Sequence, residues 1–196
     1  MRDMVKPTVS LFVICVLVSF CLAFVNGITK DTIDERIAKD AEEQRKMVMS
    51  EADSFKKLAG WEEKDESGLI REVYAAYSGE ALIGYVFSAD PVGYGGEIAV
   101  TVGISSGNKI TGVKIGNNSE TPGLGTKTAD DMFTGQYQDK DISTDFTVTK
   151  RPATAENEIQ AVSGATISSK AVTKAVQASN ELGGKLLQEQ DGGEVQ

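Results

Sequence analysis

The segment 163–169 combines hydroxyl side chains with small residues and reads Ser-Gly-Ala-Thr-Ile-Ser-Ser. Apolar or small residues follow at helical spacing up to Gly183-Gly184, a pair typical of a helix end. These residues are Val172, Ala175, Val176, Ser179 and Leu182. The pattern predicts a helix that begins near Ile167, directly after Thr166, whose hydroxyl can be esterified to a phosphate.

The first amides of such a helix lack intrahelical partners, and the helix dipole places partial positive charge there. A phosphate on Thr166 would therefore occupy an anion-binding position, and Gly164 and Ala165 leave room for it. The hydroxyls of Ser168 and Ser169 can bond this phosphate or cap the helix. Because serine and threonine cap helices routinely, the residues alone leave two interpretations open, a phosphate site and an N-cap.

Three motifs resemble those of one flavoprotein family. Residues 163–168 are similar to the Ser/Thr-Gly-Ala-Thr-x-Ser/Thr motif of FMN-binding domains. Residues 119–127 contain Glu-Thr-Pro-Gly-Leu-Gly, which resembles a signature of the G-type component of Rnf complexes and of the related C-type component of sodium-pumping NADH:quinone oxidoreductases. Residues 93–98, Gly-Tyr-Gly-Gly-Glu-Ile, resemble the glycine-rich segment that leads into a strand of the same domain. The motifs follow the family's order across about residues 68–184.

The resemblance implies that Thr166 carries FMN through a phosphoester, attached by a separate flavin transferase that moves FMN from FAD. It also implies a membrane-anchored electron-transfer subunit in a complex that passes electrons between reduced ferredoxin and NAD, coupled to sodium or proton translocation. No complete active site is expected in this chain alone. The other expected cofactor-binding residues are Ser163, Gly164, Ala165, Ser168, Ser169, Glu120, Thr121, Gly123, Leu124, Gly125 and Tyr94.

The loop 116–127 suits one wall of a cofactor site. Pro122 stiffens the loop, while Gly123 and Gly125 allow close backbone approach to a flat ring and supply amides for its polar atoms. Tyr94 and Leu124 are candidates for apolar cover of the isoalloxazine ring. Without the resemblance, Thr-Pro-Gly is simply a turn, the commonest outcome for a Pro-Gly pair.

Composition excludes several classes of function. The net charge of −9 argues against nucleic acid as a partner, since phosphate-backbone binding needs a basic surface. The chain has no histidine, which removes the commonest metal ligand and the usual triad base. Both cysteines, Cys15 and Cys21, lie in an apolar segment, so no thiolate metal site or iron-sulfur cluster is expected in the rest. A redox role must therefore rest on a bound organic cofactor.

Residues 8–28 carry no charge and are about as long as the roughly 20 residues that a spanning helix needs. Arg2 and Lys6 precede this segment, whereas residues 30–43 are net acidic. The positive-inside rule therefore predicts that residues 1–7 are cytoplasmic and that the flavin domain lies on the extracytoplasmic side of the cell membrane.

Two other interpretations of the apolar segment exist. A cleaved signal peptide is one, because residues 25–27 offer small residues at a possible cut site after a basic start. A lipoprotein is the other, but it requires a small residue before Cys21, where the sequence has Phe20. A single transmembrane helix is the interpretation that we favour.

The remaining segments predict an α+β domain with an antiparallel sheet and flanking helices. Residues 29–65 are predicted to form a juxtamembrane amphipathic helix, which begins at a capping box of Thr32 and Glu35. One apolar face of that helix consists of Ile33, Ile37, Ala41, Val48, Ala52, Phe55 and Leu58. The FMN-binding domain is assigned to residues 66–187 and a disordered tail to residues 188–196.

Within the domain, period-2 patterns predict two hairpins and one later strand. The strands 72–78 and 81–87 flank Gly79-Glu80, and the strands 97–104 and 109–115 flank residues 105–108. Residues 145–149 form the later strand. A short helix is expected to place its three large apolar residues in the core. They are Met132, Phe133 and Tyr137.

Three alternative functions remain. The chain is alternatively a C-type component of a sodium-translocating NADH:quinone oxidoreductase, or an exported structural or binding domain without a cofactor. A standalone flavin reductase is the third, although the absence of histidine argues against the proton donors that it would need. A cofactor-free domain predicts a colourless protein in which Thr166 can be replaced without loss of function.

Overall fold

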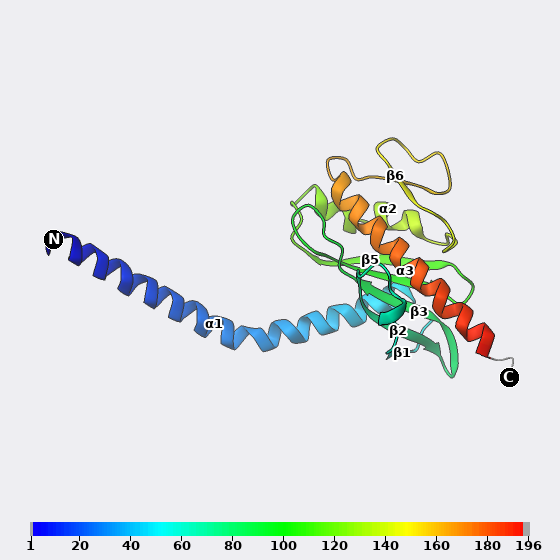
Figure 1. Ribbon diagram of the computed structural model, residues 1–196, viewed down its shortest axis with the longest axis horizontal. Coiled ribbons are helices and arrows are strands. Elements are labelled where there is room, and N and C mark those ends of the chain that lie inside the picture. Colours follow the sequence, from blue (N-terminus) through cyan, green and yellow to red (C-terminus); the bar gives the residue numbers. More distant parts are fainter. Residues whose placement is uncertain (1, 194–196) are drawn as a thin grey trace. The chain divides into compact units, whose positions relative to one another are not determined.

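The computed structural model describes residues 2–193, with side chains described for residues 7–30, 33 and 35–190. The chain divides into two compact units, Met1–Ala41 and Glu42–Gln196. The first unit consists of the larger part of helix α1 (Arg2–Val48), and the second is a folded domain that includes the end of α1. Figure 1 shows the elements in chain order.

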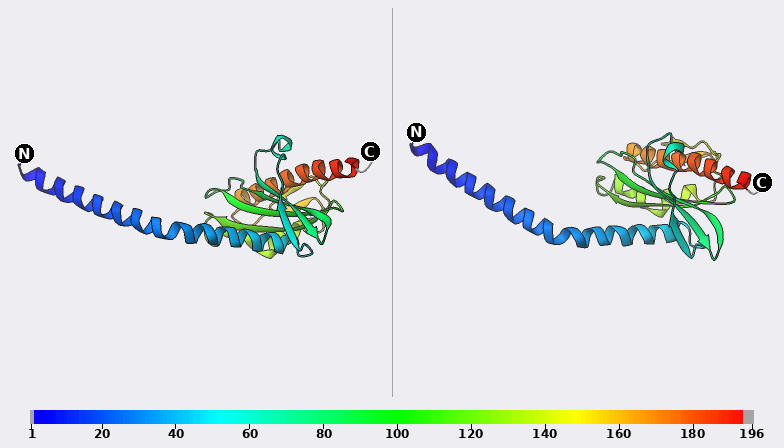
Figure 2. Two further views of the ribbon diagram at one scale, coloured as in Figure 1. Left: turned by 90° about the horizontal axis from the view of Figure 1, so that it is seen from below. Right: turned by 60° about the horizontal axis from the view of Figure 1, so that its bottom comes forward.

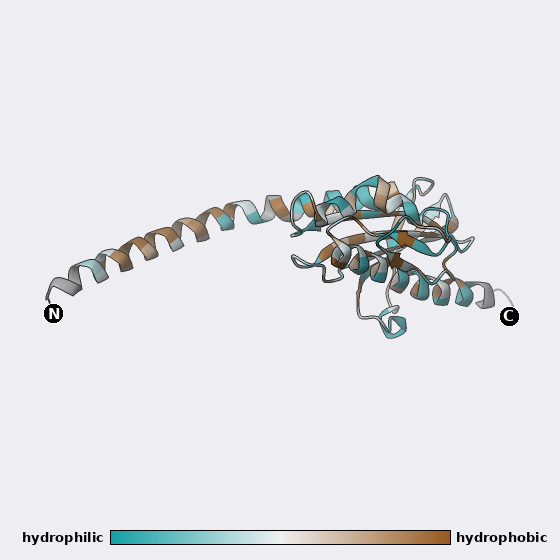
Figure 3. Ribbon diagram, turned by 90° about the horizontal axis from the view of Figure 1, so that it is seen from above, coloured by the Kyte–Doolittle hydropathy of each residue, from teal (hydrophilic) through white to brown (hydrophobic). Residues whose placement is uncertain are grey.

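The apolar segment is helical throughout. Residues Pro7–Lys30 of α1 are long and apolar enough to cross a membrane, with a mean hydropathy of 2.8 over an 18-residue window. Apolar residues follow one another along this part of the helix (Figure 3), and side chains such as Phe12 and Phe20 are exposed. The predicted spanning segment 8–28 lies inside this range.

The juxtamembrane helix differs from the prediction at both ends. No helix starts at Thr32, because α1 continues without a break through residues that favour helices, with Glu42 and Lys46 paired one turn apart. The helix ends at Val48, and Phe55 lies in strand β1 (Ser54–Lys57). The predicted helix is therefore wrong beyond Val48, because the edge of the sheet offers this segment backbone partners that local periodicity cannot reveal.

Five antiparallel strands form one sheet in the order β1-β2-β3-β4-β5. The strands after β1 are β2 (Ile70–Ser78), β3 (Ala81–Ala89), β4 (Ile98–Ser105) and β5 (Ile110–Asn118). Both predicted hairpins are present, and with the flanking helices they confirm the α+β fold class.

The two faces of the sheet bury different sets of side chains, as the strand period of two requires. On one face Val73 and Phe87 pack with residues of helix α3 (Thr166–Gly193) in the main core. On the other face Ala76 and Val86 pack with Val48 at the end of α1. The strands thus lie between α3 and residues 42–48 of α1 (Figure 2).

Helix α3 does not end at Gly183-Gly184 and continues to Gly193. A Cβ on Gly183 would lie 2.8 Å from Ile104 Cδ1, so this glycine lets the helix approach the sheet closely. Leu186 and Leu187 beyond it are buried. The predicted disordered tail is therefore wrong for residues 188–193, and residues 194–196 lie outside the described part of the chain.

Several short elements complete the domain. They are η1 (Glu62–Lys64), η2 (Gly125–Ala129), α2 (Asp131–Thr134), η3 (Gly135–Tyr137) and the parallel pair β6 (Thr147–Thr149) and β7 (Glu158–Gln160). The predicted strand 145–149 is thus the shorter β6, and its partner β7 was not predicted.

The short helical segment places two of its three large apolar residues in the core. Phe133 and Tyr137 are buried as expected, whereas the Met132 side chain is 89 % exposed. The Tyr137 hydroxyl is hydrogen-bonded to Thr173 on α3 at 2.7 Å, and burial raises the pKa of Tyr137. The bond ties this segment to α3. The expectation for Met132 was wrong because a helix this short buries only one side.

Candidate functional site

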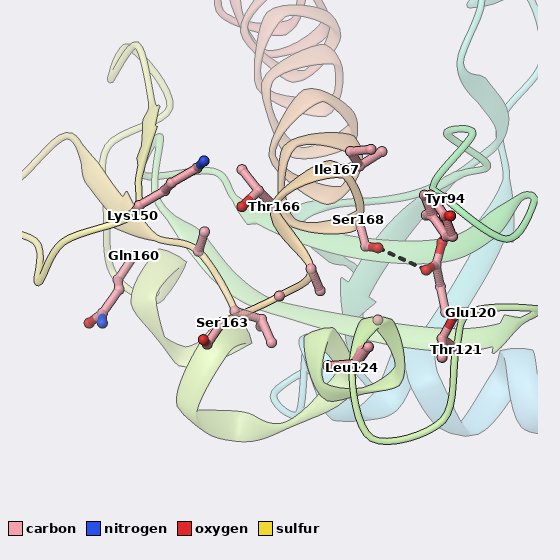
Figure 4. Close-up of a pocket in the computed structure, with 15 residues that line it drawn as sticks. Tyr94, Glu120, Thr121, Leu124, Lys150, Gln160, Ser163, Thr166, Ile167 and Ser168 are labelled. Atoms are coloured by element: carbon pink, nitrogen blue, oxygen red, sulfur yellow. Dashed lines mark hydrogen bonds between the residues drawn. The ribbon is translucent and has the colours of Figure 1, made fainter.

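A cavity of about 860 Å³ lies at the N-terminus of α3 (Figure 4). The expected cofactor-binding residues that line it are Tyr94, Glu120, Thr121, Leu124, Gly125, Ser163, Gly164, Ala165, Thr166 and Ser168. Gly123 and Ser169 do not line it. Residues that the sequence did not single out complete the wall, and these are Lys150, Gln160, Ala161, Val162 and Ile167. The fold thus brings three distant motifs to one cavity.

Thr166 is the first residue of α3 and is partly exposed in the cavity wall. Gly164 precedes it with a φ of +78°, a conformation that favours glycine, and a Cβ there would lie 3.1 Å from Leu124 Cδ2. Within residues 2–193 the amides of Thr166, Ile167 and Ser168 have no hydrogen-bond acceptor. The start of this helix therefore presents free N–H groups beside the threonine hydroxyl.

The hydroxyls of the two serines after Thr166 both form hydrogen bonds within the protein. Ser169 Oγ donates to the Ala165 carbonyl at 2.9 Å and accepts from the Val162 amide at 3.0 Å. Ser168 Oγ donates to Glu120 Oε2 at 2.8 Å, and both residues are buried. Ser169 thus bonds to the turn that precedes α3 rather than capping the first amides of the helix, while Ser168 connects α3 to the loop that carries Glu120.

Glu120 joins three segments of the site. Its Oε1 atom accepts hydrogen bonds from the amides of Tyr94 at 2.7 Å and Gly95 at 3.1 Å, and its Oε2 atom accepts the bond from Ser168. The residue is only 5 % exposed, and no cation in the described part of the chain pairs with it. This carboxylate fixes the β3–β4 connection, the loop after β5 and the start of α3 relative to one another.

The glycines of two motifs make room for this arrangement. A Cβ on Gly93 or on Gly125 would lie 2.1 Å from a Glu120 carboxylate oxygen, and one on Gly95 would lie 2.2 Å from the Ser119 carbonyl oxygen. Gly125 was expected to permit approach to a flat ring, whereas Gly93 and Gly95 were assigned only to a glycine-rich segment that leads into a strand. At all three positions the close neighbour is the protein. Packing around Glu120 therefore explains the glycine spacing.

Gly123 belongs to a turn that is held by hydrogen bonds among its own residues. Its φ is +76°, and its amide donates to Thr126 Oγ1 at 3.0 Å. The Leu124 amide donates to the Thr121 carbonyl at 3.1 Å. The expectation that the Gly123 amide faces the cofactor is therefore not met, and this part of the motif is the Thr-Pro-Gly turn.

Three large apolar side chains stand exposed at the cavity. They are Tyr94 at 72 %, Ile167 at 56 % and Leu124 at 44 % exposure. They come from the β3–β4 connection, the first turn of α3 and the loop after β5. Exposed apolar groups gathered at a pocket are typical of a binding site. Ile167 went unnoticed because the sequence places it on a helix without showing which side faces the cavity.

Lys150 supplies a positive charge to the cavity wall. It follows β6 directly, and Figure 4 shows its ammonium group directed toward Thr166. Within residues 2–193 the ammonium group makes no hydrogen bond or ion pair. A single lysine after a short strand carries no distinctive sequence signal, and only the fold brings it to Thr166.

The loop that follows Lys150 is held by Glu158 at the start of β7. Its carboxylate accepts bonds from the Thr154 amide at 2.7 Å, the Thr154 hydroxyl at 2.9 Å and the Arg151 guanidinium at 3.0 Å. These donors, the Thr154 amide first, lower the pKa of Glu158 to about 2. The ionised carboxylate thus organises the loop beside the cavity.

We expect Glu158→Gln to lower the unfolding midpoint at pH 7 but not near pH 2. A depressed pKa stabilises the fold above the unfolded value of 4.5, and this stabilisation is lost as pH falls through about 2. Thermal unfolding of the full chain in detergent at several pH values measures the difference. Glu156→Gln is the control, and an equal deficit at pH 7 and pH 2 would contradict the assignment.

The fold is that of an FMN-binding domain. A family model with that description matches residues 93–181, which contain all three motifs. The chain belongs to the family of G-type components of ion-translocating ferredoxin:NAD(+) oxidoreductase complexes. It is 35 % identical to the G-type component of the proton-translocating complex of Clostridium ljungdahlii, over 89 % of this chain and 88 % of that protein. It is 36 % identical to the G-type component of the Na(+)-translocating complex of Acetobacterium woodii, over 88 % of this chain and 87 % of that protein.

Two solved structures share the fold. The C-type component of the Na(+)-translocating NADH-quinone reductase of Parabacteroides distasonis has a TM-score of 0.51 and 23 % identity, over 59 % of this chain and 62 % of that chain. NqrC of Shewanella oneidensis has a TM-score of 0.51 and 17 % identity, over 74 % of each chain. At these identities the likeness concerns the fold, and the G-type relatives are the nearer group.

The residues of the cavity fit FMN. A volume of about 860 Å³ lies in the range of small-molecule sites. The free amides of α3 and the Lys150 ammonium suit a phosphate, while Tyr94, Leu124 and Ile167 offer apolar surface to a flat ring system. Both halves of the cofactor thus find matching chemistry in this cavity.

Proposed function

We propose that this chain is a membrane-anchored electron-transfer subunit that carries FMN covalently on Thr166, in an ion-translocating ferredoxin:NAD(+) oxidoreductase complex. The observation that carries the proposal is the position of Thr166. It begins a 28-residue helix in the wall of the cavity, within a domain that matches the FMN-binding family. Relatives named as G-type components of such complexes align with most of the chain.

Thr166 acts as a tether, and the surrounding residues hold the cofactor. When bound, FMN supplies one- and two-electron redox chemistry that no side chain here provides. The amides at the start of α3 and Lys150 balance the charge of the phosphodiester. Tyr94, Leu124 and Ile167 cover apolar ring surface and limit access of water.

Attachment is a group transfer from FAD, catalysed by a flavin transferase. The Thr166 oxygen forms a bond to the phosphorus of the FMN half, the bond from that phosphorus to the bridging oxygen breaks, and AMP leaves. The hydroxyl proton passes to the transferase, because the cavity lining contains no histidine and the Glu120 carboxylate is already bonded to three donors. The reaction needs no oxidant or reductant.

The membrane arrangement forms part of the proposal. Residues 1–7 lie in the cytoplasm, residues 8–28 span the membrane uncleaved, and the domain of residues 66–187 faces the extracytoplasmic side. The support is the apolar helix Pro7–Lys30 and the excess of basic residues before it. A tether suits this location because a cofactor lost there is not readily replaced. The remaining subunits of the complex are the electron partners.

The test is the intact mass of the full chain after coexpression with a flavin transferase. We expect an increase equal to FMN less one water, with flavin fluorescence that persists in a denaturing gel. An unmodified, non-fluorescent chain from its native membrane would refute the proposal and favour the cofactor-free domain. Copurification with components of an NADH:quinone oxidoreductase would instead favour the C-type alternative.

Lys150→Met is expected to slow the initial incorporation of FMN about two- to fivefold, since an exposed ion pair contributes up to about 1 kcal/mol. The folded state should be unaffected, because Lys150 makes no ion pair within the described residues. Incorporation is followed by intact mass during reaction with transferase and FAD. Lys174→Met, an exposed lysine further along α3, is the control. Equal rates of FMN incorporation in both variants would show that Lys150 does not contribute to cofactor binding.

A further inference from the structure

Among the described residues that line the cavity, Glu120 is the only carboxylate, and no described cation pairs with it in this buried position. All three of its bonds are accepted from neutral donors, two backbone amides and the Ser168 hydroxyl. These bonds satisfy its oxygen atoms but leave one full negative charge in the wall. The other charged residue of the lining, Lys150, lies on the opposite side of Thr166 in Figure 4.

A charge in this position acts on a ring bound in the same cavity. Solvent screens it poorly, because Glu120 is 5 % exposed and its carboxylate packs closely against Gly93 and Gly125. Its position is also fixed, since three hydrogen bonds hold the carboxylate to two other segments, the β3–β4 connection and the start of α3. A fixed negative charge opposes the addition of electrons to a neighbouring redox group and thereby lowers the reduction potential of that group.

We propose that the buried Glu120 carboxylate lowers the reduction potential of the flavin that this cavity holds. The inference rests on the proposed function, because it requires FMN in the cavity. It assigns Glu120 two roles, in positioning the three segments and in setting the potential. The charge, rather than the hydrogen bonds, carries the second role.

Glu120→Gln separates the two roles. The glutamine carbonyl oxygen can accept from the Tyr94 and Gly95 amides, and its NH₂ group can donate to Ser168 after the hydroxyl rotates. The shape and the number of hydrogen bonds are thereby conserved while the charge is removed. Ser168→Ala is the complementary variant, since it removes one bond and keeps the charge.

The experiment is a spectroelectrochemical titration of the full chain, flavinylated by coexpression with the transferase and held in detergent. Intact mass first establishes that each variant carries FMN. Glu97→Gln is the matched control, because it removes an equal charge from the β3–β4 connection to which Glu120 is hydrogen-bonded, where Glu97 is exposed and bonded to Arg71.

We expect Glu120→Gln to raise the midpoint potential by about 30 mV or more, which is a tenfold change in the equilibrium constant of a two-electron reduction. Glu97→Gln and Ser168→Ala should produce no such rise. A midpoint potential for Glu120→Gln equal to that of the Glu97→Gln control would overturn the inference. The proposed attachment of FMN to Thr166 would not be affected by that result. Failure of Glu120→Gln to take up FMN would also overturn the inference, because Glu120 would then serve site assembly. A wild-type chain without FMN would refute the proposed function itself.

Discussion

Thr166→Val is expected to abolish covalent FMN completely. Valine matches the shape of threonine but has no oxygen that can form the phosphoester. The Thr166 hydroxyl makes no hydrogen bond within the described residues, so the start of α3 should remain intact. Intact mass and in-gel fluorescence after coexpression with a flavin transferase measure the loss.

Ser163→Ala is the control for the Thr166 variant. Ser163 is exposed in the same cavity and also carries a hydroxyl, but it lies before the turn that positions the helix start. We expect this variant to retain the full FMN mass. If Thr166→Val retained covalent FMN and Ser163→Ala lost it, FMN would be attached to Ser163 rather than to Thr166.

Gly84→Ala should destabilise the domain by about 3 kcal/mol or more, through backbone strain and overpacking together. Gly84 has a φ of +156°, and a Cβ there would lie 2.1 Å from the Ile104 carbonyl oxygen. That oxygen belongs to the neighbouring strand β4, so relief requires movement of the central sheet rather than of a flexible side chain. Because β4 and β5 lead to the loop that carries Glu120, we also expect this wall of the cavity to be held less firmly in place.

The measurement is urea unfolding of the full chain in detergent, followed by the fluorescence of Trp61. This is the only tryptophan, and it is buried in the main core. Gly135→Ala is the control, since no atom lies within 4 Å of a Cβ at that position. A Gly84→Ala domain as stable as this control would show that the sheet accommodates the methyl group.

Motifs singled out residues that the fold brings together, because candidate chemistry can be recognised from residue type. The hydroxyl of Thr166, the small residues before it and the Glu-Thr-Pro-Gly-Leu-Gly loop were expected together, and the fold places them around one cavity. The hairpins followed from alternation and turn residues. These features are local, and a single segment of sequence contains the information for each.

The errors share one cause, which is that partners distant in sequence override local preference. Phe55 fits a helical pattern but pairs with β2 at the sheet edge. Gly183 fits a helix end, yet it is the point at which α3 approaches Ile104.

The sequence by itself determined the apolar helix, the antiparallel α+β domain, the family and the candidate threonine, because each depends on composition, period or a short motif. Only the tertiary structure decided the setting of that threonine. The fold buries Glu120 against Gly93 and Gly125, directs Lys150 toward Thr166, and exposes Ile167 at the same cavity as Tyr94 and Leu124. These residues lie far apart in the chain, and the charge and apolar surface of a cavity exist only once the fold has brought them together.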